Sequence, residues 1–348
     1  MNNSFKNILK SVFSRKEMIY IVSFFFFVLG LLVFTFFFPN YHDLKEPVLV
    51  EVKKGQTLSQ ISDTLYQRKI IPSKINMKIA AIIYGAERKI KAGRYVIPNG
   101  LSYLQLVELL IEGSPDPEVL ITIGEGIWQM DLAKLLKENF GIDSSSVIEL
   151  SRSKSFLNSL GIYADNLEGY LLPETYFFYA HSAPEEILRK LASEMDKIFS
   201  DNKVIARMKE LNMDKHKILT MASIIDAESN LFSEFKTISG VYHNRLKKGM
   251  LLQADPTVQY LIRDRRKNKI YFKDLEIDSK YNTYKYAGLP PSPINNPGKD
   301  AIYAALYPEN HKYLYFVANG QGGHYFSTNM NDHSVNVSRY RQWRASQK

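Results

Sequence analysis

The sequence predicts an α+β protein, in which a single N-terminal transmembrane helix is followed by a small module and by a larger mixed α+β domain. Three observations lead to this expectation. A long uncharged apolar run lies near the N-terminus, and a turn-forming GSPDP segment separates a short section of the remaining chain from a long one. Helical and strand patterns are also segregated along the sequence, whereas in doubly wound α/β proteins they alternate.

Length and composition are compatible with this organisation. The chain has 348 residues, of which 45% are hydrophobic and 23% are charged, so it can bury one large core or two smaller ones. The expected parts are a cytoplasmic tail at 1–17, a membrane anchor at 18–38, a linker at 39–47, a small module at 48–116 and a larger domain at 117–348.

The apolar run from Met18 to Phe38 has 21 residues without a charge, which is enough to cross a bilayer as one helix. The basic residues Lys6, Lys10, Arg15 and Lys16 precede it. A cleaved signal peptide would have a shorter apolar core and a small-residue cleavage site, but this run ends in FFFPNY. We therefore expect a retained single-pass anchor in the cell (inner) membrane, with the N-terminus in the cytoplasm and the larger domain outside the cytoplasmic membrane.

The small module is expected to contain two strands and three helices. Strand-like segments lie at Val48–Val52 and Lys91–Ile97, and helices are expected from Leu58 after the cap residue Thr57, around Ser73–Tyr84, and from Ser102 to Ile111. The first strand and the KGQTLSQIS helix resemble the start of a LysM domain, a fold that binds glycans containing N-acetylglucosamine. The resemblance implies a LysM-like module that contacts such a glycan.

The larger domain begins with helical segments and ends with strands. A strand is expected at Val119–Ile123, and past residue 270 the chain becomes rich in loops and strands, with a hairpin formed by Tyr313–Ala318 and His324–Ser327. Helices are expected near Ile127–Asn139, Ser145–Ser151, Pro184–Phe199 and Lys217–Phe232.

The Lys217–Phe232 helix is the most informative segment because it places a carboxyl group within an apolar stripe. Glu228 is in phase with Met221, Ile224, Ile225, Leu231 and Phe232, whereas Ser223, Asp226 and Asn230 fall mostly on the other face. An inward carboxyl has a raised pKa, which suits a general acid near neutral pH, and Asp226 is expected to stay solvated and ionised. The alternative is that Glu228 is the buried partner of an arginine.

Several classes of function are disfavoured by the sequence. The formal charge is +9, but the only basic run outside the anchor flank, Arg263–Lys269, includes Asp264 and no stacking residue, so we expect a solvated loop and no nucleic-acid partner. The surplus of positive charge suits binding to an anionic polymer or to a membrane surface. The chain has no cysteine, and its seven histidines form no pair with zinc-site spacing. No metal, no cofactor and no serine nucleophile of the G-x-S-x-G type are expected.

Six segments together resemble the YceG-like family of endolytic murein transglycosylases. They occur in the family's order as LEGYLLPETY, ASIIDAES, NRLKKGMLLQADPTVQY, YNTYKYAGLPPSPINNPG, LYFVANGQGGHYFST and NDHS. The resemblance implies a membrane-anchored lyase that cuts peptidoglycan glycan strands internally, between N-acetylmuramic acid and N-acetylglucosamine, and leaves 1,6-anhydro ends. The domain at 117–348 is then the catalytic transglycosylase domain, which would limit the length of nascent strands.

Carried over by motif, Glu228 is the catalytic acid and base. Many relatives have two glutamates in this motif where this chain has Asp226 and Glu228, but helical phase also selects Glu228. The residues expected to position the substrate are Asn244, Arg245, Gln253, Asp255, Asn282, Tyr284 and His324. Each could be structural instead: Asn244 and Asn282 as caps or loop staples, Asp255 as a turn residue, and Arg245 as the ion-pair partner of Glu228 or Asp255.

Two other functions remain open at this point. One is a muramidase that uses water, with Asp226, Glu168 or Glu174 as its second carboxylate. The other is a non-catalytic wall-binding scaffold in which Glu228 is a buried structural acid. Besides the glycan strands and the cytoplasmic membrane, peptidoglycan synthases or division proteins are the expected partners.

Overall fold

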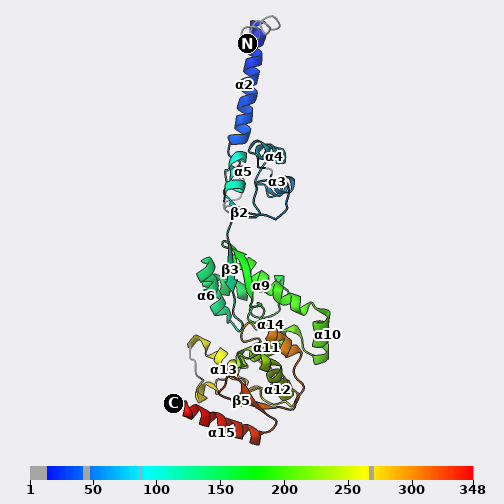
Figure 1. The fold of residues 1–348 in the computed structure, drawn as a ribbon, viewed down its shortest axis with the longest axis vertical. Coiled ribbons are helices and arrows are strands. Elements are labelled where there is room, and N and C mark those ends of the chain that lie inside the picture. The colour runs from blue at the N-terminus through cyan, green and yellow to red at the C-terminus, as the bar shows by residue number, and fades with distance from the viewer. Residues whose placement is uncertain (1–13, 42–47, 87, 114, 266–269, 348) are drawn as a thin grey trace. The chain divides into compact units, whose positions relative to one another are not determined.

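The computed structural model describes residues 14–41, 48–86, 88–113, 115–265 and 270–347, which form two compact units divided after Glu118 (Figure 1). The expected mixed α+β fold with one N-terminal apolar helix is confirmed. Most of the expected tail and linker, at 1–13 and 42–47, and the end of the basic run, at 266–269, lie outside the described residues.

The first unit begins with α2 (Arg15–Phe37), the apolar helix expected from the sequence. A capping box formed by Ser14 and Glu17 starts it, and Phe38 leaves the helical conformation at its other end. The helix has 23 residues, and its most apolar window has a mean hydropathy of 2.6. By length and composition, α2 can cross a membrane.

The rest of the first unit has the expected order of strand, helix, helix, strand and helix: β1 (Val48–Val52), α3 (Leu58–Gln67), α4 (Lys74–Ile83), β2 (Gly93–Ile97) and α5 (Tyr103–Glu112). The two strands are antiparallel, with Val48 opposite Ile97. Thr57, Ser73 and Ser102 each accept a hydrogen bond from a main-chain N–H in the first turn of the helix that follows, so the three expected helix starts are confirmed.

The second unit contains the remaining elements, most of them helical, with two small sheets formed by β3 with β4 and by β5 with β6. They are β3 (Glu118–Thr122), α6 (Gln129–Phe140), α7 (Ser144–Arg152), α8 (Lys154–Ser159), β4 (Thr175–Tyr179), α9 (Pro184–Phe199), α10 (Asn202–Leu211), α11 (Lys215–Glu228), α12 (Phe235–Lys247), α13 (Asp255–Leu261), α14 (Lys299–Leu306), β5 (Tyr315–Ala318), β6 (His324–Ser327) and α15 (Met330–Ser346), with short 3-10 turns at Phe232–Glu234, Arg263–Arg265 and Phe272–Asp274.

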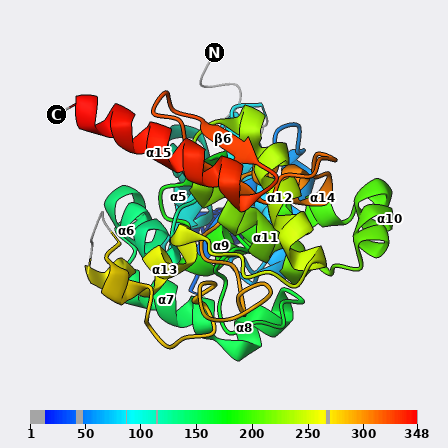
Figure 2. The same cartoon turned by 90° about the horizontal axis from the view of Figure 1, so that it is seen from below.

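Helix α11 is the central helix of this unit and packs against α12 and α14 (Figure 2). Every residue from Ile218 to Ile225 is buried, so the middle of the helix has no solvated face. The expectation that Ser223 lies on a polar face is wrong. This serine is fully buried, donates to the carbonyl oxygen of Thr220 at 2.8 Å and accepts from the N–H of Ile294 at 3.0 Å.

The α11 helix is also shorter than expected and ends at Glu228. Leu231 and Phe232, expected on its apolar face, lie beyond its end and are 39% and 58% exposed. Past residue 270 the expected hairpin is present as β5 and β6, but the helices α14 and α15, which were not expected, also lie there. The polar sequence of α15, MNDHSVNVSRYRQWRAS, has no apolar stripe by which its helical period could be recognised.

Asn296 connects three segments that are far apart in the sequence. Its side-chain oxygen accepts from the N–H groups of Gly169 at 2.9 Å and Leu171 at 3.2 Å, and its Nδ2 donates to the carbonyl oxygen of Ile127 at 3.1 Å and to Glu168 Oε1 at 3.3 Å. The side chain is fully buried. The LEGYLLPETY segment is therefore attached to the loop before α6 and to the segment before α14.

Candidate active site

Glu228 is the last residue of α11, and the next residue, Ser229, is extended, with φ −149° and ψ 147°. The carboxyl group is partly buried. Burial raises the pKa of Glu228 to about 7, nearby Asp255 adds to the rise, and a hydrogen bond from Tyr242 and the more distant Arg245 oppose it. The expected rise is confirmed, so Glu228 can both donate and accept a proton near neutral pH.

Tyr242 on α12 holds one oxygen of this carboxyl group. Its hydroxyl donates a hydrogen bond to Glu228 Oε1, and its buried ring packs edge-on against Phe316 at 5.9 Å between centroids. Burial raises the pKa of Tyr242 well above its usual value, so it remains a neutral donor. Tyr242 had no signal in the sequence, because only the packing of α12 against α11 brings the two side chains together.

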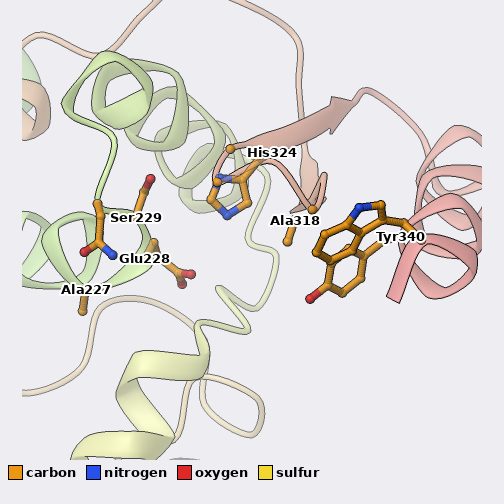
Figure 3. A pocket seen from close by; sticks show the side chains of 11 residues that line it. Ala227, Glu228, Ser229, Ala318, His324 and Tyr340 are labelled. Atoms are coloured by element: carbon orange, nitrogen blue, oxygen red, sulfur yellow. The ribbon is translucent and has the colours of Figure 1, made fainter. Parts of the chain in front are cut away.

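Two pockets meet at Ala227 and Glu228. The first, of about 340 Å³, lies between the end of α11, the β5–β6 hairpin and α15 (Figure 3). The second, of about 240 Å³, is lined by Trp128, Ile294 and Asn295 together with the start of α13. The Glu228 carboxyl group therefore faces space on two sides.

His324 lies in the first pocket, between Glu228 and Tyr340 (Figure 3). Glu234 fixes it, because the two carboxylate oxygens of Glu234 accept from the His324 main-chain N–H at 2.9 Å and pair with Nδ1 at 2.7 Å. Gly323 makes room for this carboxylate, since a Cβ there would lie within 2.6 Å of Glu234 Oε1. His324, which was expected to contact substrate, lies in the first pocket. Its partner Glu234 had no signal in the sequence.

Arg245 and Asn244 hold α12 to neighbouring loops. Arg245 is 7% exposed and donates to the main-chain oxygens of Leu314 at 2.6 Å and Leu252 at 2.7 Å. Among the described ion pairs it has none with Glu228 or Asp255. Asn244 donates through Nδ2 to the carbonyl oxygens of His311 at 2.9 Å and Tyr313 at 3.0 Å. For Asn244, this is the structural role that the sequence left open, in which the side chain holds a neighbouring loop in place.

The other four expected positions lie near α13. Asp255, the first residue of that helix, lines the second pocket and accepts a hydrogen bond from the Tyr284 hydroxyl at 2.5 Å. Gln253 is exposed, with φ +48°, and its N–H donates to the carbonyl oxygen of Thr283 at 3.1 Å. Asn282 is fully buried and donates to main-chain oxygens at 2.8 and 2.9 Å, again as a staple. Of these four residues, Asp255 lines the second pocket, and Tyr284 is joined to it through the hydrogen bond to Asp255.

The expectation for Asp226 is wrong. The side chain is partly buried, and its Oδ1 accepts from the N–H of Gly298 at 3.2 Å. Burial raises the pKa of Asp226 to about 7, and the nearby Glu125 adds to the rise. Gly126 also lies against Asp226, since a Cβ there would be 2.5 Å from Oδ2. The loops that cover this side of α11 come from distant parts of the sequence, so helical periodicity did not reveal them.

Glu168 and Glu174, the other carboxylates considered from the sequence, are engaged elsewhere. Glu168 is 5% exposed and accepts from the N–H of Gln129 at 2.9 Å, and burial raises its pKa to about 7. Glu174 forms an ion pair with Lys299 at 2.7 Å. Neither residue lines the two pockets at Glu228. Within the described residues, no group of three or more histidine, aspartate or glutamate side chains is arranged to hold a metal ion.

Comparison with known protein families gives a match over most of the chain. The model of the YceG-like family matches residues 50–339. The chain belongs to the YceG-like family.

Relatives in this family resemble the chain over most of its length. The endolytic murein transglycosylase of Bacillus subtilis is 32% identical over 317 residues, which cover 87% of each chain. The endolytic murein transglycosylase of Streptococcus pneumoniae is 28% identical over 326 residues, covering 85% of this chain and 59% of that one. A crystal structure of a YceG-like protein from Listeria monocytogenes has a TM-score of 0.57 and 33% identity, covering 84% of this chain and 99% of that one.

Proposed function

We propose that this YceG-like protein is a peptidoglycan lytic transglycosylase that cuts glycan strands internally, with Glu228 as its acid and base. The observation that carries the proposal is the position of Glu228, a carboxyl group with a pKa of about 7 where two pockets meet. A strand that occupies both pockets has its scissile bond at the carboxyl group, as internal cleavage requires. The names of the relatives from Bacillus and Streptococcus support the same activity.

In the proposed reaction, Glu228 first donates one proton and then accepts another. Within the described residues Tyr242 donates to Oε1, so Oε2 is the oxygen available to the substrate. Protonated Glu228 gives its proton to the glycosidic oxygen as the bond from that oxygen to C1 of N-acetylmuramic acid breaks. The C6 hydroxyl of the same sugar then bonds to C1 and returns its proton to the Glu228 carboxylate. The products are a 1,6-anhydro end and a free 4-hydroxyl group, and no water is consumed.

A hydrolase would need a second carboxylate at the scissile bond. The candidates from the sequence are engaged by other groups: Asp226 by Gly298, Glu168 by Gln129 and Glu174 by Lys299. Among the described residues that line the two pockets, Asp255 is the other carboxylate, and the Tyr284 hydroxyl donates to it. Asp226, Glu168 and Glu174 are thus engaged away from the scissile bond, which supports the lyase over a muramidase that uses one of them.

The remaining parts of the chain fit an enzyme that acts at the membrane surface. In this proposal α2 is a single-pass anchor with a cytoplasmic N-terminus, and the unit from β1 to α5 is a LysM-like module that contacts the glycan. An anchored, internally cutting lyase would end the elongation of nascent strands close to the peptidoglycan synthases or division proteins. In this proposal the residues that contact the strand are Asp255, Tyr284 and His324. The loops around the strand are positioned by Asn244, Arg245 and Asn282. Gln253 lies just before the start of α13.

Mass spectrometry of muropeptides tests the activity. Purified peptidoglycan is digested with the full-length protein in detergent and, in parallel, with Glu228→Gln and Asp255→Asn. We expect anhydro-muramyl ends from the wild type, their loss with Glu228→Gln, and their retention at reduced yield with Asp255→Asn. Reducing ends would identify a hydrolase, and an unchanged product pattern with Glu228→Gln would remove Glu228 from the chemistry.

A further inference from the structure

We propose that Tyr340 and Trp343 on α15 form an aromatic platform that binds a sugar ring of the strand, at the end of the first pocket away from Glu228. This inference rests on the proposed function and adds a binding subsite to it. Both side chains line the pocket that also contains Glu228 (Figure 3). The platform is therefore continuous with the site of cleavage.

The two rings are nearly parallel and lie close together. They stack with centroids 5.8 Å apart and an interplanar angle of 20°. Trp343 is 38% exposed. Its indole lies against Gly320, which has φ +83°, and a Cβ at that position would collide with the ring. The glycine-rich turn of the hairpin thus accommodates the indole at the edge of the pocket.

Helix α15 is also held on the hairpin by contacts other than that of Trp343 with Gly320. His333 stacks on Tyr315 at 5.2 Å, and Asn336 donates to Ser327 Oγ at 3.0 Å, so the first half of the helix is attached to β5 and β6. Tyr340 and Trp343 lie in the second half. The part of Trp343 that remains exposed beside its contact with Gly320 is available for a ligand.

The chemistry of the pocket fits a sugar of an acidic strand. Aromatic rings offer a large rigid surface to the C–H face of a pyranose at a small cost in side-chain entropy. Between the platform and Glu228, polar groups of the Asn230 and His324 side chains line the same pocket and can pair with hydroxyl groups. Helix α15 carries three arginines and one aspartate, a balance that favours the carboxylates of N-acetylmuramic acid.

The two tryptophans of the chain make the proposal measurable. Trp128 lines the second pocket and Trp343 lines the first, one on each side of Glu228. In the full-length Glu228→Gln protein, Trp128→Phe leaves Trp343 as the fluorophore, and Trp343→Phe leaves Trp128. The probes are peptide-free oligosaccharides of alternating N-acetylglucosamine and N-acetylmuramic acid, from a disaccharide to strands long enough to fill both pockets.

We expect the emission of both tryptophans to change with long oligosaccharides, with saturation at the same concentration. Trp343→Ala and Trp343→Leu in the Glu228→Gln background should each raise the Kd for long oligosaccharides by about 10-fold, because an aromatic contact is lost. Trp343→Phe should restore much of the affinity. Tyr163→Ala, which removes an aromatic ring that is 90% exposed away from these pockets, is the matched control and should leave the Kd unchanged.

Two results would each overturn the platform and leave the lyase in place. The first is a Trp343 emission that stays constant when an oligosaccharide changes the emission of Trp128. The second is wild-type affinity in Trp343→Leu. Formation of anhydro ends by the corresponding Glu228 proteins, measured in parallel, separates the two proposals. If neither tryptophan responds and no anhydro ends form, the platform fails together with the proposed function.

Discussion

Replacing Glu228 with glutamine should stabilise the second unit at neutral and alkaline pH while it removes the activity. The pKa of Glu228 in the folded protein is about 7, raised from an ordinary value of 4.5 mainly by burial. Folding therefore favours the protonated carboxyl group. The wild type loses stability as the pH rises from about 4.5 to about 7, because the unfolded chain can ionise there at less cost. Neutral glutamine has no such penalty.

The size of the effect follows from the rise in pKa. A rise from 4.5 to about 7 corresponds to about 3 kcal/mol, and this is an upper bound because the carboxyl group is only partly buried and water screens its charge. We expect Glu228→Gln to equal the wild type near pH 4.5 and to exceed it by about 1–3 kcal/mol at pH 8. Glutamine retains an oxygen that can accept from Tyr242, so this hydrogen bond does not offset the gain.

Tryptophan emission during urea unfolding is the appropriate assay. Trp128 and Trp343, the two tryptophans of the chain, both lie in the second unit, so the signal reports this unit within the full-length protein. Unfolding is measured at several pH values from 4.5 to 8 for wild type and variant. Glu138→Gln, at an exposed position on α6, is the matched control for the chemical change. A difference that is independent of pH, or a less stable Glu228→Gln at pH 8, would refute the reasoning.

Three further outcomes are expected. Tyr242→Phe removes the hydrogen bond that lowers the pKa of Glu228, so the alkaline limb of the rate of anhydro-end formation should move up by about one pH unit; an unmoved limb would contradict this. Asn296→Ala should destabilise the second unit by about 3–5 kcal/mol in urea, because it leaves several buried groups unpaired; a loss below 1 kcal/mol, about the size of one hydrogen bond, would show that these bonds are dispensable. Gly169→Ala, at φ +86° against a proline side chain, should cost more in the same measurement than Gly249→Ala, at φ +65° in open space; equal costs would argue against the collision.

The sequence predicted the elements with strong local signals. Cap residues marked α3 and α5, and alternation marked β1. The phase of α11 correctly predicted an apolar environment for Glu228. Helical phase does not predict which segments from elsewhere in the sequence pack against the helix. For this reason the end of the helix at Glu228 and the buried state of Asp226 were not foreseen.

The site was only partly predictable for a similar reason. An asparagine can bind a sugar or a main-chain carbonyl with the same amide, and only the fold shows that Asn244 and Asn282 use their amides within the protein. Tyr242 reaches Glu228 through the packing of α12 against α11, and Trp343 reaches the first pocket through the packing of α15 on the hairpin. The sequence has no local signal for either packing.

The end of α11 at Glu228 has an electrostatic consequence. The peptide dipoles of a helix add to a partial negative charge at its C-terminus, where the last carbonyl oxygens point out of the helix. A carboxylate at this end is disfavoured, whereas a protonated carboxyl group is not, so the orientation of α11 acts in the same direction as burial. Because this contribution comes from the backbone, it is independent of whether aspartate or glutamate stands two residues earlier. The main chain of the central helix thus favours the protonated form of Glu228.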